Sequence, residues 1–156
     1  MFRLNRLTDY GVVVLSQIFL SNNGLCSAQQ IAQRTGVPSP TVAKVLNVLT
    51  REGLVESHRG ATGGYALSRP ADKIAVADII QALEGPIALT ACVDNAEGHC
   101  DVEAICPMRG GWDKVNRAIQ QALDSVSLLD MIAGVTPFGP EQSPREMQQD
   151  SASTAG

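Results

Sequence analysis

Hydrophobic positions recur at helical spacing in the first part of the chain. Residues 8–21 carry an apolar stripe with the spacing of one helix face, and Thr8 is expected to cap its N-terminus. Ser27 and Gln30 then form the serine-to-glutamine pattern of a capping box, which predicts a short helix over about residues 27–34. The pattern therefore predicts two successive helices before residue 36.

A third helix is expected to begin at Ser39, with this serine as the N-cap and Pro40 at the first helical position. Gly36 suits the left-handed residue that ends the preceding helix, and Gly53 stops the third one. Two helices joined by so short a turn predict a helix-turn-helix. The apolar positions of the third helix are Val42, Val45, Leu46 and Leu49.

Two short strands are predicted next, at residues 54–58 and 65–68, with a glycine-rich hairpin turn at 59–64 between them. A helix-turn-helix followed by a hairpin has the element order of a winged helix. We therefore expect residues 1–70 to form a winged helix-turn-helix DNA-binding domain.

The second half of the chain predicts two more helices with a loop between them. A helical stripe that starts at Val76 ends at Gly85, and the segment of about 90–108 shows no period. A second stripe predicts one helix of about twenty residues from Trp112 to about Ala133.

The expected fold is thus mainly α with a small β-hairpin wing. Residues 71–133 would hold the loop and a long C-terminal dimerisation helix, because the stripe on that helix is wider than so small a domain can cover. Residues 134–156 are rich in Ser, Gln and Pro and are expected to be a disordered tail.

Composition excludes some classes of protein. The chain has 156 residues, of which 44% are hydrophobic, enough to bury a core. No apolar run approaches the ~18–20 residues of a membrane span. The N-terminus lacks the apolar stretch of a secretory signal, so we expect a soluble, cytoplasmic protein without a membrane partner.

Charge is divided unevenly along the chain. Residues 1–70 hold seven Lys or Arg and three Asp or Glu, whereas residues 71–156 hold five and thirteen. The overall formal charge of −4 hides this division. A basic first half suits a phosphate-bearing partner, and an acidic second half suits another task.

The start of the third helix and the tip of the hairpin are the candidate DNA contacts. In a helix-turn-helix the second helix lies in the major groove with its first residues near base edges, and a wing can reach a phosphate or the minor groove. Any one of these residues alone could instead be a capping or solvated surface residue. The candidates are Ser39, Pro40, Thr41, Lys44, Arg59 and Gly60.

Three of the four cysteines are grouped in the loop, with seven residues between Cys92 and Cys100 and five between Cys100 and Cys106. These gaps are longer than the paired hooks of structural zinc sites and suit a loop around an iron–sulfur cluster. Zinc, or redox-active thiols without a ligand, stay open as alternatives. Cys26 stands apart and is expected to be a buried, inert thiol.

A cluster usually takes four protein ligands, and the loop offers three cysteines. A fourth ligand that is not a thiolate would bind more weakly, which suits a sensor better than a structural site. Packing the last helix against a second copy would also set two recognition helices about one DNA turn apart, as a palindromic operator requires.

Three features together resemble the iron–sulfur winged-helix transcriptional regulators of the IscR and NsrR type. They are residues 7–10 (LTDY), residues 53–67 (GLVESHRGATGGYAL) and the three loop cysteines. Residues 85–92 and the last helix look most like the branch that regulates SUF-system iron–sulfur assembly. The resemblance covers about residues 1–133.

This resemblance implies a homodimeric bacterial transcription factor, usually a repressor, that binds operator DNA. It implies a 2Fe–2S or 4Fe–4S cluster held by Cys92, Cys100 and Cys106, whose gain or loss changes operator affinity. It also implies that Arg59 and the start of the recognition helix contact the DNA.

The chain departs from the pattern of this family at two places. IscR-like members have a histidine as the fourth ligand where this chain has Arg109. NsrR-like members can take a carboxylate from the partner's N-terminal helix, which makes Asp9 the candidate here, ahead of His99. The recognition-helix glutamate of IscR-like members is Ala43 in this chain, so operator preference does not carry over.

Three functions compete at this point. The first is a cluster-sensing repressor of iron–sulfur assembly genes. The second is a winged-helix repressor whose cysteines bind zinc or sense oxidants or nitric oxide directly. The third, an enzyme, is disfavoured because the sequence contains no Cys-x-x-Cys pair, catalytic triad pattern or phosphate loop.

Overall fold

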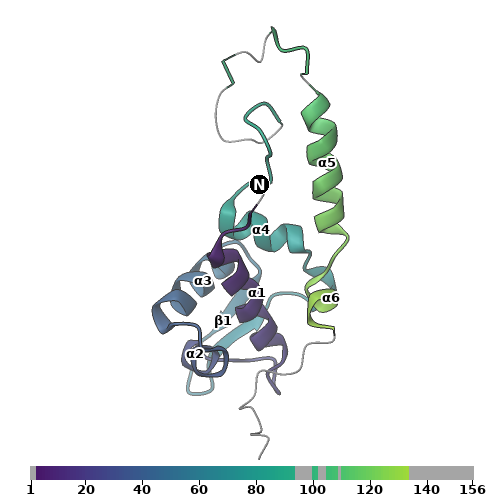
Figure 1. The fold of residues 1–156 in the computed structure, drawn as a ribbon. Coiled ribbons are helices and arrows are strands. Elements are labelled where there is room, and N and C mark those ends of the chain that lie inside the picture. The colour runs from purple at the N-terminus through teal and green to yellow at the C-terminus, as the bar shows by residue number, and fades with distance from the viewer. Residues whose placement is uncertain (1–2, 94–99, 102–104, 109, 134–156) are drawn as a thin grey trace, which may run out of the picture.

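The computed structural model describes residues 3–93, 100–101, 105–108 and 110–133, so the predicted tail at 134–156 lies outside the described residues. The elements pack into a head at one end, from which one helix projects (Figure 1). In chain order they are α1 (Arg6–Phe19), α2 (Ala28–Thr35), α3 (Ser39–Arg51), β1 (Val55–His58), β2 (Gly64–Leu67), a 3-10 turn (Ala71–Lys73), α4 (Val76–Glu84), α5 (Gly111–Asp124) and α6 (Leu128–Ile132).

Helix α1 begins two residues before the predicted start, and Asn5 rather than Thr8 caps it. The Asn5 side chain accepts a hydrogen bond from the Leu7 N–H at 3.2 Å. Thr8 lies inside the helix, is 1% exposed and donates its hydroxyl to the Glu84 carboxylate. The prediction of Thr8 as the cap is therefore wrong, because a distant carboxylate engages its side chain.

Helix α2 has the predicted capping box. The Gln30 side chain accepts from the Ser27 N–H at 2.9 Å, and the Gln30 N–H donates to the Ser27 hydroxyl at 3.2 Å. Gly36 ends the helix with φ 73°, in the left-handed region that favours glycine. Both local signals are confirmed.

Helix α3 begins one residue earlier than predicted. Pro38 occupies the N-cap position, and its carbonyl accepts from Thr41 N–H at 2.9 Å and Val42 N–H at 3.0 Å. Ser39 is thereby already helical and makes no side-chain cap. The prediction of Ser39 as the N-cap with Pro40 in the first helical position is corrected by this one-residue shift.

The wing is a two-stranded antiparallel hairpin in which Val55 faces Leu67 and His58 faces Gly64. A single pair of backbone hydrogen bonds also joins the hairpin to the segment before α2: Cys26 N–H to Tyr65 O at 3.0 Å, and Tyr65 N–H to Cys26 O at 2.8 Å. A Cβ on Gly64 would lie 2.9 Å from the Cys26 backbone, so the close approach requires glycine there. The wing is thus fastened to the helix-turn-helix.

One main core lies at the centre of the head. Helices α1, α2, α3, α4 and α6 all contribute to it, together with strand β1 and Ile74. Its largest fully buried side chains are Leu15, Ile18, Ile31, Leu46, Leu49, Ile74, Ile79 and Leu128. Leucine, isoleucine and valine supply this core, as the low aromatic content requires.

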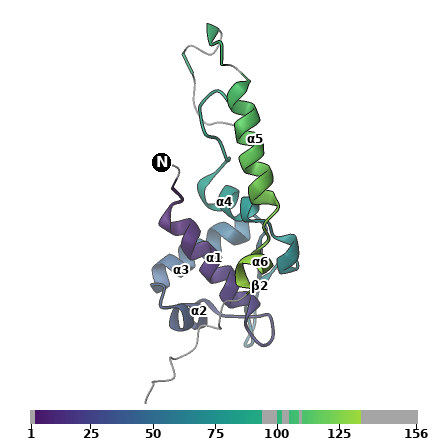
Figure 2. The same cartoon turned by 45° about the vertical axis from the view of Figure 1, so that its right-hand side comes forward.

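The predicted single helix from Trp112 to Ala133 is two helices, α5 and α6, because the chain is pinned between them. Ser127 and Asp130 form a capping box at the start of α6. The backbone beside it pairs with the segment before α4, through Val76 N–H to Val126 O at 2.9 Å and Leu128 N–H to Ile74 O at 2.8 Å. Helix α6 therefore joins the core, while α5 extends away from it (Figures 1 and 2).

Candidate nucleic-acid interface and cysteine loop

Helix α3 turns one face to the core and the opposite face to solvent. Val42, Val45, Leu46 and Leu49 are fully buried. The predicted contacts Ser39, Pro40 and Lys44 are exposed, and Thr41 is half-buried at the edge of this face. Hydroxyl and ammonium groups on one exposed face can donate to phosphates and base edges.

Asn47 is a candidate contact that the sequence analysis missed. It is exposed on α3, three residues after Lys44 and seven after Pro40, and therefore lies on the same face. A carboxamide can pair with the N6 and N7 atoms of adenine, which gives Asn47 a capacity for base readout. The helical spacing was a signal that could have identified it.

The wing tip carries Arg59 and Gly60, and both are exposed. Gly60 has φ 122°, a conformation that strains other residues, so the glycine allows the sharp turn beside Arg59. The turn presents a guanidinium at the far end of the hairpin, where a phosphate or a narrow groove can accept it.

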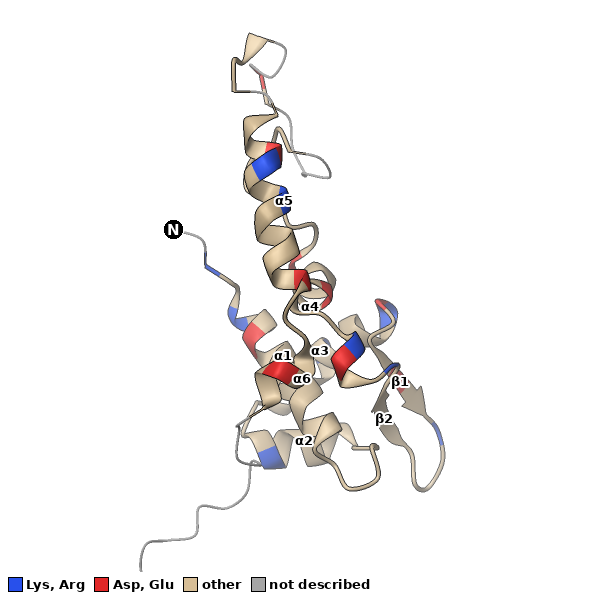
Figure 3. Ribbon diagram, turned by 90° about the vertical axis from the view of Figure 1, so that its right-hand side faces the viewer, with Lys and Arg blue, Asp and Glu red and all other residues tan. Residues whose placement is uncertain are grey.

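The basic groups of this surface are available for an anion. Among the described residues three ion pairs occur, and they join Arg51 to Glu52, Arg69 to Asp78 and Lys73 to Asp72. Lys44 and Arg59 take part in none of these pairs. Figure 3 shows one further basic segment, on α2, beside the one on the hairpin.

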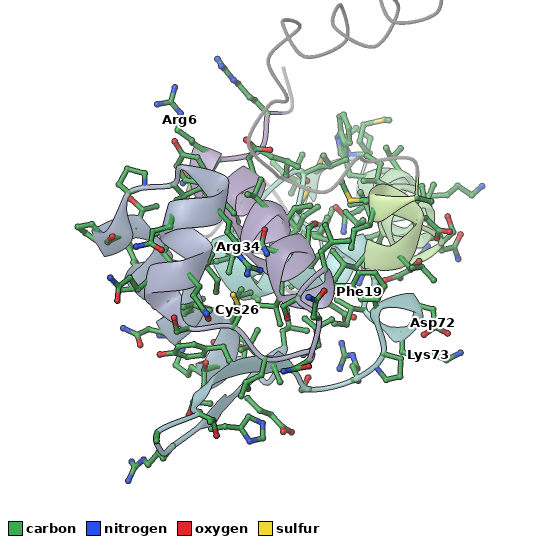
Figure 4. The ribbon with its side chains drawn as sticks, turned by 90° about the horizontal axis from the view of Figure 1, so that it is seen from below. Arg6, Phe19, Cys26, Arg34, Asp72 and Lys73 are labelled. Carbon is green, nitrogen blue, oxygen red and sulfur yellow. The ribbon has the colours of Figure 1, made fainter. Side chains whose placement is uncertain are left out.

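Cys26 lies inside the head and is 2% exposed (Figure 4). Burial raises the pKa of its thiol, and the positive charge of Arg34 opposes that rise only in part. A thiol that stays protonated is a poor nucleophile and a poor metal ligand. The predicted burial of Cys26 is confirmed.

The three loop cysteines are free and partly buried. The Cys92 sulfur lies 3.2 Å from the Thr90 hydroxyl. Within the described ranges, no group of three or more His, Cys, Asp or Glu side chains is close enough to hold a metal ion. His99 and Arg109 lie outside those ranges, as do three of the acidic residues of the loop, Asp94, Glu97 and Glu103.

The donor types of the loop fit an iron–sulfur cluster, because thiolates are its usual protein ligands. Cys92, Cys100 and Cys106 are not brought together as a group in the structure. Asp9 is exposed in the first turn of α1, where it lines a groove of about 540 Å³ with Thr8 and Met131. The single chain does not unite Asp9 with the cysteines.

A helix-turn-helix with a polar outward face, and a fastened wing with Arg59 at its tip, is the arrangement of a DNA-binding transcriptional regulator. The chain belongs to the Rrf2 family, whose model is described as an iron-dependent transcriptional regulator and matches residues 4–134. Family membership also makes the chain a regulator rather than an enzyme.

The relatives agree with this assignment. The chain is 31% identical to Protein aau3 of Rhizobium meliloti (strain 1021) over 130 residues, which are 83% of this chain and 84% of that protein. Its fold is similar to CymR, the global cysteine regulator of B. subtilis, at 30% identity and a TM-score of 0.65, covering 87% of this chain and 100% of the other. It is also similar to T. potens IscR, at 33% identity and a TM-score of 0.59, covering 85% and 87%.

The predicted class of fold is confirmed, as a mostly helical winged helix with a two-stranded hairpin. DNA binding and transcription regulation follow from the family. In the part of the chain that the structure describes, no helix has the length and apolar character needed to span a bilayer.

Proposed function

We propose that this protein is an iron–sulfur-cluster-sensing repressor of SUF-type iron–sulfur assembly genes, acting as a cytoplasmic homodimer on a palindromic operator. The observation that carries the proposal is the separation of two sets of residues in an Rrf2 chain. Three free cysteines occupy a loop beyond the head, while the polar DNA-facing residues occupy α3 and the wing.

Each set has a defined role in the proposal. Cys92, Cys100 and Cys106 would hold a 2Fe–2S or 4Fe–4S cluster, with Asp9 of the partner as the fourth ligand. The amount of bound cluster would depend on oxidants and on the supply of iron and sulfide. The DNA contacts would be made by Ser39, Pro40, Thr41, Lys44, Arg59 and Gly60.

The second copy is supported by the apolar residues that α5 and α6 leave exposed. Trp112 is 43% exposed, Val115 44% and Leu129 40%. Apolar side chains of this size are usually covered, and Trp112 and Val115 form an exposed stripe on α5 because they lie three positions apart. A dimer through this stripe would hold two heads at a fixed separation and orientation.

Glu84 offers a physical connection between the loop and the head. It is the last residue of α4, eight positions before Cys92. Its carboxylate accepts from the Asn5 N–H at 2.7 Å and from the Thr8 hydroxyl. A change in the loop can therefore bear on the N-terminus of α1, provided that DNA-bound and free states differ in cluster affinity.

The test is anaerobic purification of the full chain, with iron and sulfide counts and an absorption spectrum. We expect coloured protein with equal iron and inorganic sulfide, and we expect Cys92→Ala to abolish the colour. Gel-shift titration of DNA from a SUF operon promoter then compares cluster-loaded and cluster-free protein. Colourless anaerobic protein without iron would overturn the proposal.

Asp9 is tested separately. Asp9→Ala is expected to shorten the lifetime of the cluster in air without changing the fold, whereas Asp72→Ala, at an exposed carboxylate of the head, leaves the lifetime unchanged. An unchanged cluster lifetime in Asp9→Ala would show that Asp9 is not a ligand, and the three cysteines would stay the proposed ligands.

A second candidate function uses the same thiols without an iron–sulfur cluster. Its redox form is supported by three free, partly buried cysteines that are not brought together as a metal site. In this version the same thiols bind zinc or react directly with oxidants or nitric oxide. Metal analysis separates the two: zinc without inorganic sulfide, or thiol oxidation without any metal, would favour this alternative.

A further inference from the structure

Helix α5 buries a polar side chain where a hydrophobic one would be expected. Of its fourteen residues, all of which the structure describes, Asn116 alone is buried, and it is 6% exposed. Ile119 and Leu123 continue the same helix face and pack against Ile80 and Ile87. A carboxamide buried among apolar neighbours is costly unless both of its polar atoms are satisfied.

Both polar atoms of Asn116 bind the backbone of the segment before Cys92. Its Nδ2 donates to the Ile87 carbonyl at 2.9 Å, and its Oδ1 accepts from the Leu89 N–H at 3.1 Å. The Ile87 carbonyl and the Leu89 N–H lie two residues apart on the same side of the segment. An adjacent β-strand would offer these two groups a donor and an acceptor, as Asn116 does. Asn116 thus holds residues 87–89 as a neighbouring strand would.

We propose that Asn116 is a positioning residue for Cys92: its two hydrogen bonds fix residues 87–89 to α5 and so set where the first loop thiol lies. Only Thr90 and Ala91 lie between Leu89 and Cys92, so little chain is left to absorb a displacement. The function of that thiol rests on the proposed cluster, but its position does not, and the two are tested apart.

The first test uses metal-free full chain and iodoacetamide, with the alkylation rate of each cysteine followed by mass spectrometry. Asn116→Asp keeps the size of the side chain, keeps the acceptor for Leu89 and replaces the donor for Ile87. We expect alkylation of Cys92 to rise at least about two- to tenfold, because that factor corresponds to the loss of one hydrogen bond and the new carboxylate oxygen also faces the Ile87 carbonyl. Gln121→Glu, an exposed amide-to-acid change on the same helix, is the matched control and leaves the rate unchanged.

Cys26 distinguishes positioning from a general loss of structure. Its thiol is buried in the head, so its alkylation reports unfolding. Cys92 should change alone. An equal rise at Cys26 and Cys92, or no rise at Cys92, would overturn the proposal. If Asn116→Asp does not fold, hydrogen exchange of the unaltered chain is the deciding measurement. The Leu89 amide must exchange more slowly than the Ala88 amide, and equal rates would refute the hydrogen bond to Asn116.

The second test uses protein loaded anaerobically with iron and sulfide. Asn116→Asp should lose its cluster faster than unaltered protein, by a factor similar to that seen in alkylation, and Gln121→Glu should not. A normal cluster lifetime together with raised Cys92 alkylation would show that the Asn116 hydrogen bonds do not affect Cys92 as a cluster ligand. Failure of the unaltered protein to take up iron and sulfide would overturn the proposed function, and the alkylation result would still decide the position of Cys92.

Discussion

The head and the projecting helix α5 are held in place by different means. In the head, side chains such as Leu15, Leu46 and Ile74 are 0% exposed and pack on several elements at once. Along α5, Ile119 and Leu123 are half-buried, and the one buried side chain is polar. The head is held together by apolar packing, whereas α5 is held by a few apolar contacts and the Asn116 hydrogen bonds on one of its faces.

This difference assigns stability and responsiveness to separate regions. Segments with few buried apolar contacts open at lower free energy than core elements do. A recognition helix must keep its shape to read DNA, so its place in the packed head is suitable. In the proposed sensor the loop gains and loses a ligand and must therefore change, and its attachment to the lightly buried α5 permits this.

The largest effect is expected from a core deletion. Leu46→Ala should lower the free energy of unfolding by about 2–5 kcal/mol, because it leaves a cavity in the head. Val115→Ala, on exposed α5, should change it by less than about 0.5 kcal/mol in the monomer. Urea denaturation measures both. Equal losses would contradict the contrast, and a Val115→Ala loss that grows with protein concentration would show that a second copy covers α5.

The wing arginine should matter for DNA and not for folding. Arg59→Ala removes an exposed charge, so operator affinity should fall by about 1–3 kcal/mol with an unchanged unfolding midpoint. Binding titrations at several salt concentrations identify the contact: a uniform loss with a smaller salt dependence indicates phosphate, and relaxed specificity indicates a groove. Arg51→Ala, whose charge is paired with Glu52, serves as the control.

The boundary between the regions is pinned by the cap of α6. Ser127→Ala removes the hydroxyl that accepts from Asp130 N–H at 3.1 Å, and should lower the free energy of unfolding by about 1 kcal/mol. Hydrogen bonds from the Ser127 hydroxyl and N–H lower the pKa of Asp130, so this support is present above the ordinary aspartate pKa and is lost as pH falls. If the substitution leaves the free energy of unfolding unchanged, the backbone pairing of residues 126–128 with residues 74–76 alone separates α5 from α6.

The smallest effect is a pH dependence of the head. Because burial raises the pKa of Cys26, the folded thiol keeps its proton at a pH where the unfolded thiol has lost it. Stability should therefore decline as pH rises above the ordinary thiol value of about 8.5. Cys26→Ala should lack this part of the decline. Parallel stability curves for the two proteins between pH 8 and 10 would contradict the assignment.

Local signals in the sequence predicted much of the head. The Ser27–Gln30 box, the Gly36 terminus and the hairpin turn involve residues within a few positions of one another, and each is confirmed. Two cap assignments failed for specific reasons. Thr8 is engaged by Glu84, 76 positions away, and the Pro38 carbonyl begins α3 before Ser39 can cap it.

The contacts that place the projecting helix α5 could not be predicted in the same way. The apolar stripe of the last helix continues through residues 125–127, so periodicity alone predicted one helix where the pairing with residues 74–76 makes two. Nothing in the sequence distinguishes Asn116 from the other polar residues of its helix, because its hydrogen-bond partners lie 27 and 29 positions earlier. The arrangement of the cysteines in the proposed site stays a prediction.

The paired backbone groups of Cys26 and Tyr65 have a mechanical consequence. They tie the hairpin to the start of α2, and α2 shares one core with α3, so the predicted recognition helix and the wing are held in a single packed head. In the proposed dimer, a signal would therefore change the angle and spacing of the two heads on the DNA and leave the shape of each head unaltered.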